Sequence, residues 1–70
     1  MNPEEIVKKV SHESGVPTME IHGRSRSKKI FSARVLVYKA LREEGYSYPE
    51  IGKLMERDHT TVLRVLRKNA

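Results

Sequence analysis

The spacing of apolar residues restricts this chain to helices that pack against one another. Over residues 30–44 the apolar positions share one side of a helix: Ile30, Ala33, Val37, Ala40 and Leu41, with Phe31, Val35 and Tyr38 beside them. The 70-residue chain has no cysteine, so neither a disulfide nor a thiolate metal site can stabilise it. We therefore expect an all-α fold, a small bundle of about five helices whose longest and most buried member is the helix over residues 30–44.

Caps and glycines divide the first part of the chain. Asn2 is expected to cap a first helix that ends near Ser14, where Gly15 supplies a left-handed stop. Thr18 resembles the cap of a one-turn helix that stops at Gly23. The basic segment, residues 23–29 (Gly-Arg-Ser-Arg-Ser-Lys-Lys), has small residues and like charges without periodicity and predicts a loop. Met19 and Met55 lie at the spacing of core residues.

The second half of the chain predicts a helix-turn-helix. Ser47 and Glu50 have the spacing of a capping box, which starts a helix running from about Tyr48 to Met55. After a short link, Asp58 is a good cap for a last helix. A short helix, a tight turn and a second helix with an exposed polar start form this motif, although other helical bundles also contain such pairs.

The last helix has an apolar side and a basic side. Its apolar residues fall on the inner side: Val62, Leu63, Val65 and Leu66. The other side carries polar and basic residues: Thr60, Thr61, Arg64, Arg67 and Lys68. No acidic residue follows the cap. A helix of this kind, with short polar side chains in its first turn, suits the major groove of DNA.

The charge distribution favours a polyanionic partner. The net charge is +5 and the sequence pI is about 9.8. Residues 23–42 hold seven bases and no acid, residues 57–70 hold four bases and one acid, and the segment between them is acidic. We expect a folded surface with a basic side. Since no apolar run of membrane-spanning length and no secretory signal occurs, we also expect an intracellular protein.

Residues 57–63 read Arg-Asp-His-Thr-Thr-Val-Leu, and residues 48–52 before them read Tyr-Pro-Glu-Ile-Gly. This pair of strings resembles the C-terminal DNA-binding domain of the bacterial replication initiator DnaA. The resemblance covers nearly the whole chain. It implies one domain over residues 1–70 with a TrpR-like fold, which binds double-stranded DNA at a short, defined box. It also implies a cytoplasmic protein of the bacterial nucleoid, or one encoded by a phage or mobile element. A monomer on DNA is expected, and a dimer stays open.

The resemblance also implies roles for particular residues. Asp58, His59 and Thr60 would contact base edges in the major groove, and Pro49 would pack on a thymine methyl group. An arginine of the basic segment, Arg24 or Arg26, would enter the minor groove. The residues for which we expect phosphate contacts are Ser25, Lys28, Arg34, Tyr48, Arg57, Thr61, Arg64 and Lys68. Arg34 takes its role provisionally, because Ala33-Arg34 stands where the family often has Pro-Arg.

Simpler explanations exist for the candidate residues. Asp58 could serve only as a helix cap, and His59 could be a buried, hydrogen-bonded core residue. Thr60 and Thr61 could be no more than good first-turn residues. Their position beside Arg64 favours contact with DNA.

Other function classes find less support in the sequence. His12, His22 and His59 fall in different segments without a pattern of metal ligands, so we expect no metal and no cofactor. No nucleophile–base pair is evident, and no Gly-x-x-x-x-Gly-Lys-Ser/Thr loop of an ATPase is present. We therefore expect neither an enzyme nor a small-molecule substrate.

The alternative function is that of a small adaptor that binds a protein of the replication or transcription machinery and has only non-specific affinity for DNA. In that case the acidic positions would matter more than the start of the last helix: Glu43, Glu44, Glu50 and Glu56.

Overall fold

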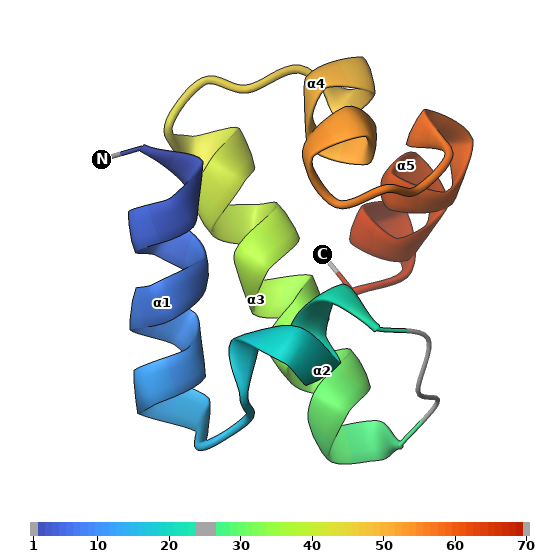
Figure 1. The fold of residues 1–70 in the computed structure, drawn as a ribbon. Helices are drawn as coiled ribbons and strands as arrows, with labels where there is room; N and C mark the ends of the chain where they lie inside the picture. The colour runs from blue at the N-terminus through green and yellow to red at the C-terminus, as the bar shows by residue number, and fades with distance from the viewer. Residues whose placement is uncertain (1, 24–26, 70) are drawn as a thin grey trace.

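The chain folds into a small helical bundle, as predicted. The structure is a computed structural model that describes residues 2–23 and 27–69. Within these residues it contains five helices and no strand (Figure 1): α1 (Pro3–Ser14), α2 (Thr18–His22), α3 (Lys28–Glu43), α4 (Tyr48–Leu54) and α5 (His59–Lys68). None of the helices in the described part of the chain combines the length and the apolar character that crossing a bilayer requires. The all-α prediction is confirmed.

Helix α3 is the centre of the fold. At 16 residues it is the longest helix, and it contacts each of the other four. α1 runs antiparallel to α3 on one side, α2 crosses it, and α4 and α5 pack on its other side (Figure 1). The helix-turn-helix therefore rests on the same scaffold helix as the N-terminal part of the chain.

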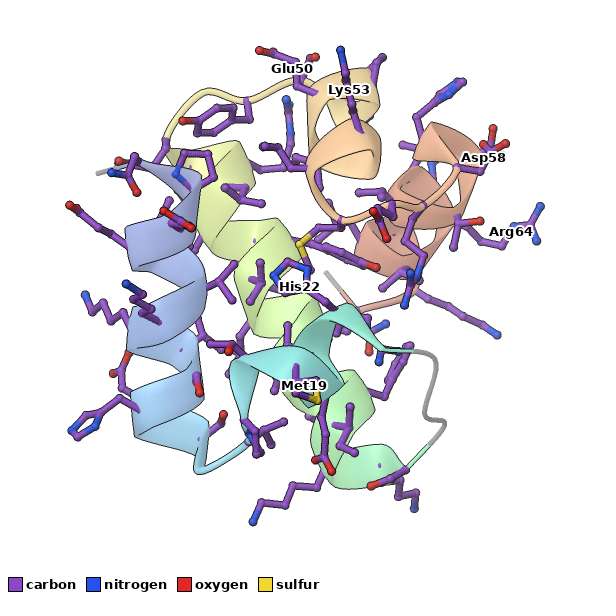
Figure 2. All side chains as sticks on the ribbon, viewed as in Figure 1. Met19, His22, Glu50, Lys53, Asp58 and Arg64 are labelled. Carbon is purple, nitrogen blue, oxygen red and sulfur yellow. The ribbon has the colours of Figure 1, made fainter. Side chains whose placement is uncertain are left out.

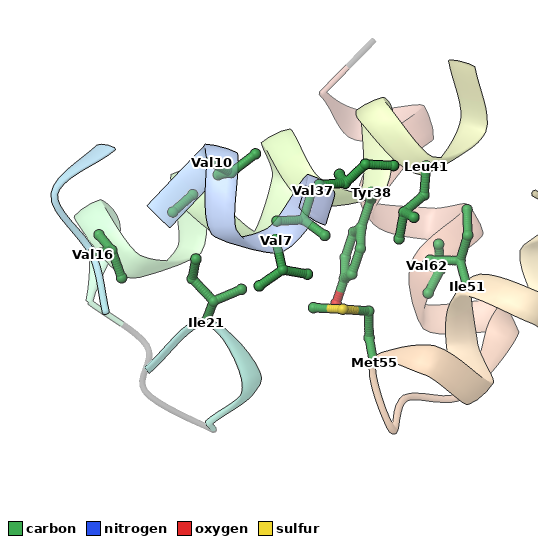
Figure 3. Packing of buried hydrophobic residues seen from close by; sticks show 12 residues of the cluster. Val7, Val10, Val16, Ile21, Val37, Tyr38, Leu41, Ile51, Met55 and Val62 are labelled. Carbon is green, nitrogen blue, oxygen red and sulfur yellow. The ribbon is translucent and has the colours of Figure 1, made fainter. Parts of the chain in front are cut away.

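The hydrophobic core joins the two halves of the bundle. Its buried side chains come from every helix, and Figure 3 shows how Tyr38 of α3 reaches across to Met55 at the end of α4. Leu41 of α3 and Ile51 of α4 are completely buried, as is Val62 of α5. Removal of these side chains from water is the main source of stability in a chain without crosslinks, and it fixes the positions of α4 and α5.

Most of the predicted helix ends are confirmed. The Asn2 side chain accepts a hydrogen bond from the Glu5 amide at 2.9 Å, and Gly15 adopts a left-handed φ of +74°. In the capping box, the Ser47 amide donates to the Glu50 carboxylate at 2.9 Å and the Glu50 amide donates to the Ser47 hydroxyl at 3.3 Å. The bond that its carboxylate accepts from the Ser47 amide is the main reason that the pKa of Glu50 is lowered. These local bonds set where α1 and α4 begin.

Two helix starts differ from the prediction. Thr18 is not a cap: α2 begins after Pro17, and no side chain caps it. α3 begins at Lys28, two residues before the predicted start, because Ser27 has extended backbone and its carbonyl accepts from the Phe31 amide at 2.8 Å. The exposed lysines are compatible with a helical turn, since their charges remain in water.

One apolar residue predicted to face the core is exposed instead. Met19 is 82% exposed, because one-turn helix α2 turns Ile21 into the core and leaves Met19 on the opposite side (Figure 2). Leu54, at the end of α4, is also exposed. Met55 is buried, as predicted.

Candidate nucleic-acid interface

The turn between α4 and α5 depends on a close approach at Gly52. Gly52 is buried in α4, and a Cβ atom at this position would lie 2.5 Å from the carbonyl oxygen of Arg57 and 3.1 Å from the amide nitrogen of His59. The Arg57 amide donates to the Gly52 carbonyl at 2.7 Å. Between them Glu56 has a φ of +54°, a left-handed conformation that favours glycine. The start of α5 is thus held directly against α4.

The first turn of α5 is exposed and polar. The Asp58 carboxylate accepts from the Thr60 amide at 2.8 Å, so the predicted cap is confirmed. This bond is the main reason that the pKa of Asp58 is lowered. The side chains of Asp58 and His59 are 69% and 59% exposed, with 3.8 Å between the His59 Nδ1 and the Asp58 Oδ1 atoms. The alternative of a buried His59 is therefore wrong.

Beyond this turn, α5 separates an inner side from a basic outer side. Val62 is completely buried, whereas Leu63, Val65 and Leu66, also predicted to face inward, are only half-buried. Outer residues line an open groove together with the half-buried Leu63: Thr60, Arg64, Arg67 and Lys68. In Figure 2, Asp58 and Arg64 both point away from the bundle along α5. The polar first turn and the basic side chains therefore belong to one continuous surface.

The start of α4 lies beside an arginine of α3. The Arg42 guanidinium lies 4.4 Å from the centre of the Tyr48 ring, in a cation–π arrangement, and also donates to the Tyr46 carbonyl at 2.8 Å. Pro49, the next residue, is exposed. Pro49 is thus available at the surface beside the half-buried Tyr48, which Arg42 holds in place.

Two of the residues for which phosphate contacts are predicted point into the protein. Arg34 is only 7% exposed, and its guanidinium donates to the carbonyls of Glu20, Ile21 and Gly23 at 2.8 to 3.1 Å. Burial, and secondarily the charge of Arg57, lower the pKa of Arg34. The Arg57 guanidinium also donates inward, including to the Gly23 carbonyl.

The inward position of Arg34 had a signal in the sequence. Arg34 follows Ile30 by four residues and precedes Val37 by three, so it falls on the inner side of α3. The partners of Arg57 had no such signal. Phosphate contact by either arginine stays a prediction that these inward hydrogen bonds do not support.

The other predicted residues divide into exposed and undescribed ones. Thr61 and Lys28 are exposed, and Lys28 begins α3. Arg24, Ser25 and Arg26 lie outside the described residues. The hydrogen bond from Arg57 to Gly23 places the beginning of the basic segment next to the residue that precedes the α5 cap.

Comparisons with known proteins agree with this arrangement. A family model described as "Bacterial dnaA protein helix-turn-helix" matches residues 3–68. The chain is 41% identical over 69 residues to the chromosomal replication initiator protein DnaA of two strains of Thermus thermophilus, an alignment that covers 96% of this chain and 16% of each relative. The chain thus spans about a sixth of the length of these relatives. No solved structure matches it significantly. The chain belongs to the bacterial DnaA helix-turn-helix family.

Proposed function

We propose that this chain binds double-stranded DNA in a sequence-specific manner, with α5 in the major groove. The observation that carries the proposal is the polar, exposed first turn of α5 on the same surface as Arg64 and Lys68. Asp58, His59 and Thr60 can reach base edges, because the N-terminal residues of a recognition helix are the ones that contact bases in the major groove. Pro49 would pack on a thymine methyl group from the adjacent start of α4.

Phosphate contacts would position this helix on the duplex. Arg64 and Lys68 follow the base-contacting turn on the outer side of α5, and Thr61 lies exposed beside them. Lys28 is exposed at the start of α3, and Tyr48 is half-buried at the start of α4. Arg24 or Arg26 would enter the minor groove, with Ser25 on a phosphate. The bond between Arg57 and Gly23 supports this, since the basic segment then begins on the same side as α5.

Membership of the DnaA family and the name of the relatives support a role in the control of replication, inside the cell and on the bacterial chromosome or a mobile element. The described part of the chain contains one helix-turn-helix, so it has one base-contacting turn. We therefore propose that a single copy of the chain, with a TrpR-like fold, occupies one short site on DNA. Selection of bound sequences from a random duplex pool would identify the site.

Base reading is tested by His59→Ala. On the selected duplex this variant should bind about ten- to a hundredfold more weakly, because a good base contact contributes about 1–3 kcal/mol of discrimination. On a duplex with the same bases in scrambled order, binding should change little. Fluorescence anisotropy measures both affinities. Equal weakening on the two duplexes would exclude base reading by His59.

Phosphate contact is tested by Arg64→Ala, with Lys53→Ala as the matched control. Lys53 is an exposed cation on α4 that points away from the bundle (Figure 2). Arg64→Ala should weaken binding to both duplexes alike and lower the slope of log K against log salt by about one. Lys53→Ala should leave that slope unchanged. The same slope for the two variants would contradict the proposed surface. The alternative function, a protein-binding adaptor, has a different test. It would be favoured if charge reversal at Glu50 and Glu56 abolished binding to a partner protein and left the affinity for DNA intact.

A further inference from the structure

The C-terminal end of α2 is held by an arginine from another helix. Arg34 of α3 donates from Nε to the Ile21 carbonyl at 2.9 Å, and from Nη2 to the Glu20 carbonyl at 3.1 Å and the Gly23 carbonyl at 2.8 Å. The last carbonyls of a helix have no partner within the helix, and a cation is favourable at this end. A five-residue helix is not stable by itself, so its position depends on such contacts and on the burial of Ile21.

A second arginine reaches the same carbonyl from the helix-turn-helix. Arg57 lies in the turn between α4 and α5, where its Nη1 donates to the carbonyls of Met55 and Glu56 at 3.2 Å each. Its Nη2 donates to the Gly23 carbonyl. Arg57 thus joins the turn that precedes α5 to the residue at which α2 ends.

We call the contact of Arg34 and Arg57 with the Gly23 carbonyl the junction. Its hydrogen bonds require guanidinium groups. Arginine presents five donors in a planar fork and can bind several carbonyls at once, whereas lysine carries one ammonium group on a flexible stem. Arg34 bridges three carbonyls and Arg57 also bridges three. A lysine at either position would keep the positive charge without the fixed set of bonds.

We infer that Arg34 and Arg57 are positioning residues, which fix the Gly23 carbonyl against the α4–α5 turn and so set the place of the basic segment relative to α5. The inference rests on the proposed function, in which the two basic parts of the chain contact one duplex. It assigns both arginines a role different from the direct phosphate contact that we expect from the sequence.

The charge-preserving substitutions Arg34→Lys and Arg57→Lys separate the two roles. If the arginines contact phosphate, lysine keeps the charge and most of the affinity. If they position the chain, each variant should lose about tenfold or more of its preference for the selected duplex over the scrambled one, because affinity for the scrambled duplex depends mainly on charge. Arg64→Lys, at a proposed phosphate contact, should weaken both duplexes to a similar, small extent. Retained preference in Arg57→Lys would overturn the inference.

A measurement without DNA distinguishes this inference from the proposed function. In hydrogen exchange followed by NMR, Arg34→Lys and Arg57→Lys should speed exchange of the Ile21 and Gly23 amides, which donate to the Pro17 and Glu20 carbonyls, at least several-fold. The amide of Leu41 in the core of α3 should keep its protection. Arg42→Lys is the control: it removes an arginine of α3 whose carbonyl partner, Tyr46, lies in another part of the chain.

The outcomes separate cleanly. Unchanged exchange at Ile21 and Gly23 in both variants refutes the junction. If the two variants exchange these amides faster, the junction is supported. If the wild-type protein binds the two duplexes equally well, the proposed function is refuted, whatever the exchange measurement shows. If Arg34→Lys does not fold, Arg57→Lys decides the matter, because Arg57 is only partly buried.

Discussion

Gly52→Ala should displace α5 from α4. The added Cβ would lie 2.5 Å from the Arg57 carbonyl oxygen, 3.1 Å from the His59 amide nitrogen and 3.3 Å from the His59 Cα atom. All three are backbone atoms, so no side chain can rotate away. Ordinary contact begins at 3.4 Å, so the two segments must separate by about 0.9 Å at the closest point.

The expected loss of stability follows from two opposing terms. Overpacking of this kind costs about 1–3 kcal/mol, and the clash with backbone favours the upper part of that range. Alanine returns about 0.5–1 kcal/mol through its higher helix propensity. The free energy of unfolding should therefore fall by about 1–2 kcal/mol, which corresponds to a Tm lower by roughly 4–16 °C in a domain of this size.

The effect on DNA binding should exceed the effect on folding. Binding geometry tolerates displacements of about 0.5 Å, so the shifted turn should lose most of its preference for the selected duplex. Gly45→Ala is the control: Gly45 has a φ of +100° with open space around it, so alanine there costs about 1–2 kcal/mol without moving α5. Circular dichroism gives the stabilities and fluorescence anisotropy gives the affinities. Wild-type stability and binding in Gly52→Ala would refute the close approach of α4 and α5.

Three further substitutions test local features. Glu56→Gly should raise the free energy of unfolding by about 0.5–1 kcal/mol in chemical denaturation, because φ is +54° there; a loss of stability would contradict that conformation. Asp58→Ala should lower the Tm at neutral pH. The pKa of Asp58 is lowered in the folded state, so the stabilisation by its carboxylate is complete above the ordinary aspartate pKa and disappears as the pH falls through the folded-state pKa. The difference in Tm between the two proteins should therefore close below about pH 4. A Tm difference that does not change with pH would exclude the charged cap. Leu41→Ala should cost about 2–5 kcal/mol in urea unfolding, because Leu41 is fully buried where α3 meets its neighbours, and a cost under 1 kcal/mol would contradict that packing.

The sequence by itself determined the helices, most of their ends and the helix-turn-helix. These features depend on residues three or four positions apart, such as the Ser47–Glu50 capping box and the Asp58 cap, and the chain order alone brings such residues together. The exposed, polar start of α5 was predictable for the same reason, since Val62 and its apolar neighbours fix which side of the helix faces inward.

Only the tertiary structure decided how the helices use their long side chains. Arg57 and Gly23 are 34 positions apart in the sequence, and no periodic pattern relates them. The same holds for Gly52: a side chain is excluded at this position only because α5 lies against α4. Met19 was predicted to be buried and is exposed, because one turn of helix can direct only one side toward α3. Contacts between distant segments depend on how whole helices pack, and a local pattern of residues does not predict that packing.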